Sequence, residues 1–68
     1  MSTNARLTGL IGRVTVPIPE GAPGEVLLPV RGGSEAFAAS ADHPIAKHKQ
    51  VLVIAELSPR SVLVTPYP

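Results

Sequence analysis

The residues of this chain that could bind a metal are few. His43 and His48 lie five positions apart, with Asp42 beside the first of them. A zinc site needs about three nitrogen, sulfur or oxygen ligands in converging geometry, and the sequence contains no cysteine. We therefore expect the histidines to be exposed turn residues, and we expect no metal and no cofactor.

Catalytic residues are equally hard to find. A serine nucleophile needs a base held against its hydroxyl by a third group, and no serine of the chain lies in a nucleophile elbow: Ser34, Ser40, Ser58 and Ser61. The five acidic residues occur singly, so no carboxylate pair is available for acid–base work: Glu20, Glu25, Glu35, Asp42 and Glu56. The sequence predicts a protein that is not an enzyme, without catalytic residues.

One basic cluster, Lys47, His48 and Lys49, suggests nucleic-acid binding as an alternative function. Small β-barrels bind single strands through aromatic stacking beside a basic groove. The sequence has one Phe, one Tyr and a net charge of +1, which makes both contributions weak. Three arginines could strengthen the cluster if the fold brings them near it: Arg13, Arg31 and Arg60.

The elements that position these residues are predicted to be strands. The chain has 68 residues, enough for one domain, and its eight prolines and six glycines divide it into short segments without helical periodicity. Apolar alternation and turn signals predict strands at residues 9–18, 25–30, 35–40, 50–57 and 62–65, with at most one helical turn at residues 46–49. Residues 1–6 are expected to be a flexible lead-in to a domain at 7–68.

Two strands support more detailed expectations. In the first, Val14, Val16 and Ile18 alternate with polar residues and should share one inward face. The strand at residues 50–57 is apolar at nearly every position, so we expect it to be central and covered on both faces. Gly9 and Gly12 would let the first strand bend and close a small five-stranded barrel.

Such a barrel interior is too small for every apolar residue of these strands. Some should face outward and form an interaction patch for a partner or a second copy; the other interpretation is that they complete the core. The candidates are Leu10, Ile11, Leu27, Leu52, Ile54 and Leu63.

The spacing of small and apolar residues resembles a known family, the C-terminal soluble domain of NfeD-like proteins. The matching segments are LTGLIGRV at 7–14, GEV at 24–26, AAS at 38–40, Ile45, VLVI at 51–54 and LVTP at 63–66. One departure is His48, which stands in the turn where the family usually has glycine.

The resemblance implies an all-β, OB-like barrel that usually follows transmembrane helices and acts with stomatin-, prohibitin- or flotillin-class membrane proteins. This sequence has no apolar run near the roughly 20 residues that span a bilayer, a second departure. We therefore expect a cytoplasmic protein-interaction module without direct membrane insertion. It would reach the membrane through a partner or through a transmembrane segment outside this sequence.

Overall fold

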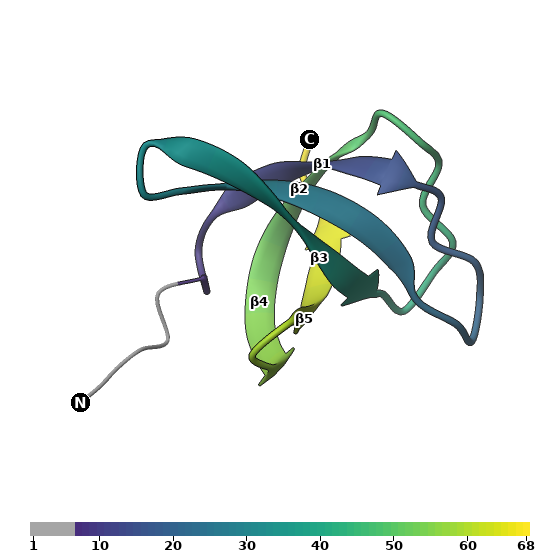
Figure 1. The fold of residues 1–68 in the computed structure, drawn as a ribbon. Helices are drawn as coiled ribbons and strands as arrows, with labels where there is room; N and C mark the ends of the chain where they lie inside the picture. The colour runs from purple at the N-terminus through teal and green to yellow at the C-terminus, as the bar shows by residue number, and fades with distance from the viewer. Residues whose placement is uncertain (1–6) are drawn as a thin grey trace.

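Five strands run through residues 7–68, the part of the chain that the computed structural model describes (Figure 1). They are β1 (Ile11–Val16), β2 (Gly24–Val30), β3 (Gly33–Ser40), β4 (Gln50–Ser58) and β5 (Ser61–Pro66). All five lie where the sequence predicts them, with ends within two residues of the expected positions. The expected lead-in, residues 1–6, lies outside the described residues.

The strands close into a barrel in the order β1-β2-β3-β5-β4, with β4 pairing back onto β1. All neighbours are antiparallel except β3 and β5, which run parallel over Ala38–Ser40 and Ser61–Leu63. This is the expected all-β, OB-like architecture. The long connection from β3 to β4 crosses one end of the barrel, where Ile45 forms a bridge with Ile18.

Glycine is required where β1 approaches β2. A Cβ atom on Gly12 would lie 2.5 Å from the carbonyl oxygen of Leu27. Gly9, just before β1, has a φ of 95° and donates its N–H to the carbonyl of Val53 over 2.8 Å. Both glycines were predicted to bend the chain. In the structure, Gly12 allows the close approach of β1 to β2, and Gly9 allows a turn before β1.

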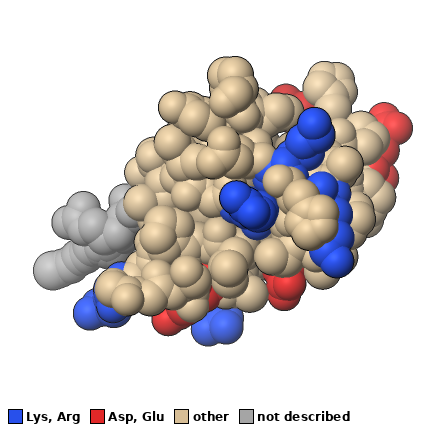
Figure 2. Space-filling model, turned by 90° about the horizontal axis from the view of Figure 1, so that it is seen from above, with Lys and Arg blue, Asp and Glu red and all other residues tan. Residues whose placement is uncertain are grey.

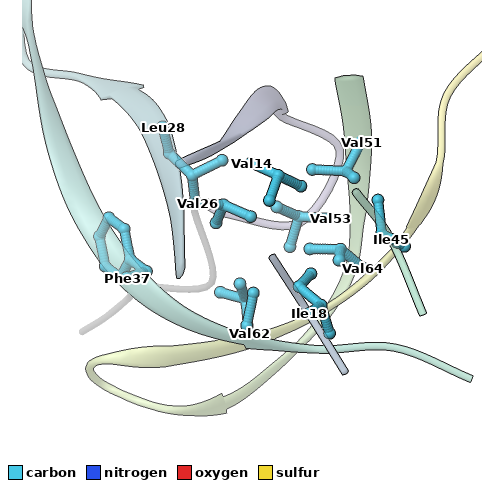
Figure 3. Packing of buried hydrophobic residues seen from close by; sticks show 11 residues of the cluster. Val14, Ile18, Val26, Leu28, Phe37, Ile45, Val51, Val53, Val62 and Val64 are labelled. Atoms are coloured by element: carbon cyan, nitrogen blue, oxygen red, sulfur yellow. The ribbon is translucent and has the colours of Figure 1, made fainter. Parts of the chain in front are cut away.

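The core consists of small aliphatic side chains that converge from all five strands and the connections (Figure 3). Phe37 is its one aromatic member, at 7% exposure. No polar or charged residue within 7–68 is buried. The core residues are Val14, Ile18, Val26, Leu28, Phe37, Ala39, Ile45, Val51, Val53, Val62 and Val64.

The expected inward face of the first strand is wrong at one residue. Val14 and Ile18 are buried, but Val16 is 48% exposed. The β1–β2 register shifts between Val14 and Val16, because Thr15 is an additional residue that forms a bulge. A bulge disrupts the alternation of side chains locally, and the hydroxyl of Thr15 donates to the Glu25 carboxylate over 2.8 Å.

The expectation that residues 50–57 are covered on both faces is also wrong. Val51 and Val53 are buried, whereas Ile54 is 44% exposed. A closed barrel buries only its inner face, so a strand within it has one outward face regardless of its apolar composition.

Residues 46–49 form a turn instead of a helical turn, with the N–H of Lys49 directed at the carbonyl of Ala46 over 3.4 Å. Nowhere in residues 7–68 is there a helix that could cross a membrane.

Candidate interaction surface

The outward side chains of four neighbouring strands form a band of aliphatic residues around the barrel. Ile11 of β1 lies directly opposite Leu52 of β4, and Leu63 of β5 lies opposite Ala55. Leu27 of β2 pairs with Arg13, two residues from Ile11. We name this set the outer apolar band: Ile11, Leu27, Leu52, Ile54 and Leu63.

Three members of the outer apolar band are accessible to a partner: Ile11 at 38%, Leu27 at 40% and Ile54 at 44% exposure. Leu52 and Leu63 are half-buried. Since β4 and β1 separate β5 from β2 around the barrel, Leu63 and Leu27 lie on opposite flanks of the Ile11–Leu52 pair. A partner that contacts the centre of the band would therefore meet Ile11, Leu52 and Ile54.

Ile54 owes its exposure to a bulge. The β4–β5 register shifts between Val53 and Ala55, which makes Ile54 the additional residue on β4. Leu10 differs from the other sequence candidates, because it packs against the buried core from the segment before β1. Leu10 is therefore a half-buried neighbour of the core and not part of the outer apolar band.

Sequence analysis missed two exposed apolar residues. Leu57 is 55% exposed and lies at a second register shift in β4, between Glu56 and Ser58; Val16 is exposed by the bulge at Thr15. Leu57 lies at an irregularity in a ladder and Val16 directly follows one. A pattern of alternating residues carries no signal for such an irregularity.

The basic cluster lies in the turn before β4 and is attached to β1 through the backbone. The N–H of His48 donates to the carbonyl of Val14 over 2.8 Å, and the N–H of Val14 donates to the carbonyl of Lys49 over 2.9 Å. Arg13 joins this cluster, because it precedes Val14 and pairs with Gln50. Figure 2 shows several lysine and arginine side chains gathered on one part of a face, with further basic and acidic side chains along the edges of the view.

The other two arginines do not join the cluster. Arg31 lies in the turn at the tip of the β2–β3 hairpin, and Arg60 lies in the turn between β4 and β5. β4 separates Arg60 from Lys49 by its whole length. Within residues 7–68, the basic cluster therefore occupies one end of the barrel, apart from Arg31 and Arg60.

This surface has few aromatic side chains that could stack on nucleic-acid bases. Phe37 is buried, which leaves Tyr67, at 41% exposure, as the one accessible ring among the Phe, Tyr and Trp residues of the sequence. Tyr67 borders an open groove beside Ile45 and Gln50, and its N–H donates to the carbonyl of Gln50 over 2.9 Å. A single ring does not make the series of stacking platforms that binds consecutive bases.

Two serines have structural partners. The hydroxyls of Ser58 and Ser61 lie 2.8 Å apart across the β4–β5 turn, and Ser58 also accepts the N–H of Arg60 over 3.2 Å. Between residues 7 and 68, no three His, Cys, Asp or Glu side chains come together in a group that could hold a metal ion.

Comparisons with known proteins agree with this architecture. The NfeD C-terminal domain family matches residues 11–65. The solution structure of the soluble domain of the NfeD protein YuaF from Bacillus subtilis is similar, with a TM-score of 0.77 and 28% identity over 90% of this chain and 74% of that one. The C-terminal domain of stomatin operon partner protein 1510-C from Pyrococcus horikoshii has a TM-score of 0.75 and 23% identity over 97% of both chains.

A search of curated proteins found no match. The family match covers most of the chain, from the first residue of β1 almost to the end of β5. The chain therefore belongs to the NfeD C-terminal domain family.

Proposed function

We propose that this domain is a non-catalytic protein-interaction module that binds a stomatin-, prohibitin- or flotillin-class membrane protein through its outer apolar band. The observation that carries the proposal is the exposure of Ile11, Leu27 and Ile54 on neighbouring strands of one barrel. Aliphatic residues that a small domain leaves exposed together commonly mark a contact surface.

Two further points support this function. The core is entirely apolar within the described residues, so the barrel interior offers no polar group for catalysis. The similar Pyrococcus horikoshii domain belongs to a protein named as a stomatin operon partner, which suggests a stomatin-like protein as the first partner to test.

The test is a pull-down from a membrane extract of the source organism, with the purified domain as bait. We expect recovery of a stomatin- or flotillin-like protein by the natural sequence, and loss of that protein with Ile54→Asp. Ala22→Asp is the matched control, because it adds the same charge at an exposed loop residue away from the band. Equal recovery of the membrane protein by Ile54→Asp and Ala22→Asp would contradict binding through the outer apolar band.

The rival function is single-stranded nucleic-acid binding through Arg13, Lys47 and Lys49. A protein that neutralises phosphates releases counterions, so its affinity for a polyanion falls steeply as salt rises. We expect weak retention on a polyanion column with little dependence on salt. Strong retention that falls with salt, and that Lys47→Glu with Lys49→Glu abolishes, would favour the rival.

A further inference from the structure

Among residues 7–68, the first half of β3 has a neighbouring strand on only one of its edges. β3 pairs with β2 from Gly33 to Ala39, but it pairs with β5 only over Ala38–Ser40. Figure 1 shows the β2–β3 hairpin extending beyond the rest of the barrel. The edge of β3 that faces away from β2 is therefore open between the hairpin turn and Ala38.

The register identifies the backbone groups on this open edge. The N–H of Ala38 donates to the carbonyl of Arg60 over 3.0 Å, so the backbone groups of Ala38 point away from β2. Residues two and four positions earlier point the same way, because backbone groups alternate between the edges of a strand. They are Ala36 and Ser34, and neither forms a backbone hydrogen bond across this edge with any described residue.

The corresponding edge of β2 presents fewer free backbone donors than that of β3. On β2, Leu27 is paired with Arg13 of β1, and Pro29, beyond the end of that pairing, has no N–H to offer. Proline and lysine are common means of blocking an exposed edge. The open stretch of β3 has neither, and Ser34 and Ala36 have small side chains that leave the backbone accessible.

A second copy of the chain is a poor occupant of this edge. In an antiparallel dimer, only one register uses both open residues: Ser34 of each copy then pairs with Ala36 of the other. This register places Glu35 of one copy directly opposite Glu35 of the other. Side chains at such a position are about 4.5–5.5 Å apart at Cβ, where like charges are destabilising. Glu35 is exposed, and its charge is instead complementary to a lysine or arginine on an incoming strand.

We propose that the open edge of β3, from Ser34 to Ala36, binds an extended segment of a partner protein by strand addition, with a basic residue of that segment facing Glu35. Two donors and two acceptors of the β3 backbone would hold the segment. This surface uses backbone groups of β3 and no side chain of the outer apolar band. The strand-addition proposal goes beyond the proposed function. It can be correct or wrong whether or not the outer apolar band binds a partner.

The probe is a capped pentapeptide of threonine, valine, lysine, valine and threonine, titrated into the isotopically labelled full chain and followed by NMR. We expect the amide signals of Ser34 and Ala36 to move, and their hydrogen exchange to slow about tenfold at saturation, because a strand hydrogen bond protects an amide. Absence of both effects at about 5 mM peptide would overturn the proposal, since affinity weaker than millimolar is too small for specific docking.

Two methylated peptides separate strand addition from other binding. Methylation of both valine nitrogens removes the N–H groups that would face β3, and should abolish the shifts. Methylation of the backbone nitrogen of the lysine removes an N–H on the opposite edge of the peptide, and should leave the shifts of Ser34 and Ala36 unchanged. Equal binding by the two methylated peptides would contradict strand addition, and this comparison requires no change to the protein.

Variants of the protein give an independent check. Ala36→Pro removes an N–H that the β2–β3 ladder does not use, and should abolish binding while the barrel stays folded. Glu35→Lys should weaken binding of the lysine peptide and strengthen binding of a peptide in which glutamate replaces the lysine. Ile54→Asp should leave peptide binding unchanged. Movement of the same two amides with protein concentration alone, together with a dimer in sedimentation, would show that a second copy occupies the edge and would overturn the choice of partner.

Discussion

The N–H of His48 donates to the carbonyl oxygen of Val14 over 2.8 Å, and His48 holds this position with a φ of 77°. This hydrogen bond attaches the turn before β4 to β1. A φ in the left-handed region is unfavourable for a residue with a Cβ atom. The turn therefore requires, at His48, the conformation that glycine adopts most readily.

His48→Gly should stabilise the domain. Glycine relieves the left-handed strain, and His48 is exposed, so little packing is lost. We expect the free energy of unfolding to rise by about 1 kcal/mol, measured by urea denaturation. His43→Gly is the matched control, because His43 is exposed but does not have a positive φ, and it should be neutral or destabilising. A loss of stability with His48→Gly would contradict the argument from strain.

Arg31→Asn should also stabilise the domain, at the tip of the β2–β3 hairpin. Arg31 and Gly32 have φ values of 50° and 77° between the paired residues Val30 and Gly33. Positive φ at both residues is the type I′ turn, in which asparagine followed by glycine is strongly preferred. We expect a gain of about 0.5 kcal/mol with an unchanged m-value. Arg31→Val should lose stability, since a β-branched residue tolerates positive φ poorly.

Gly12→Ala should destabilise the barrel by about 2 kcal/mol, because the new Cβ would overlap the carbonyl of Leu27 and force β1 away from β2. Thermal unfolding monitored by circular dichroism would measure the loss. The control is Gly33→Ala, where the nearest atom to a new Cβ is the carbonyl of Val30 at 3.9 Å. Comparable effects of the two substitutions would mean that the close approach of β1 and β2 is not what requires Gly12.

Val53→Asp and Ile54→Asp should have opposite effects on folding, although the residues are adjacent. Val53 is 1% exposed and Ile54 44% exposed. An unpaired carboxylate in an apolar core costs several kcal/mol, so Val53→Asp should unfold the domain, whereas Ile54→Asp should retain the dispersed NMR spectrum of the natural sequence. An unfolded Ile54→Asp variant would place that side chain in the core and contradict the bulge at Ile54.

Local pattern was sufficient to predict the strands of this protein. Turn residues such as Arg31 and Gly32 separate short apolar segments, and the apolar residues Val26 and Leu28, which alternate along β2, are both buried in the structure. These features depend on residues near one another in the chain, and a sequence displays them directly.

The surface depended on the tertiary structure. Bulges at Thr15, Ile54 and Leu57 decide that Val16, Ile54 and Leu57 face outward, because one additional residue in a ladder changes which side chains point inward. Barrel closure decides that β4 has an exposed face, and the limited pairing of β3 with β5 decides that Ser34 and Ala36 lie on an open edge. The sequence by itself determined where strands form, and the pairing of distant strands decided which residues a partner can reach.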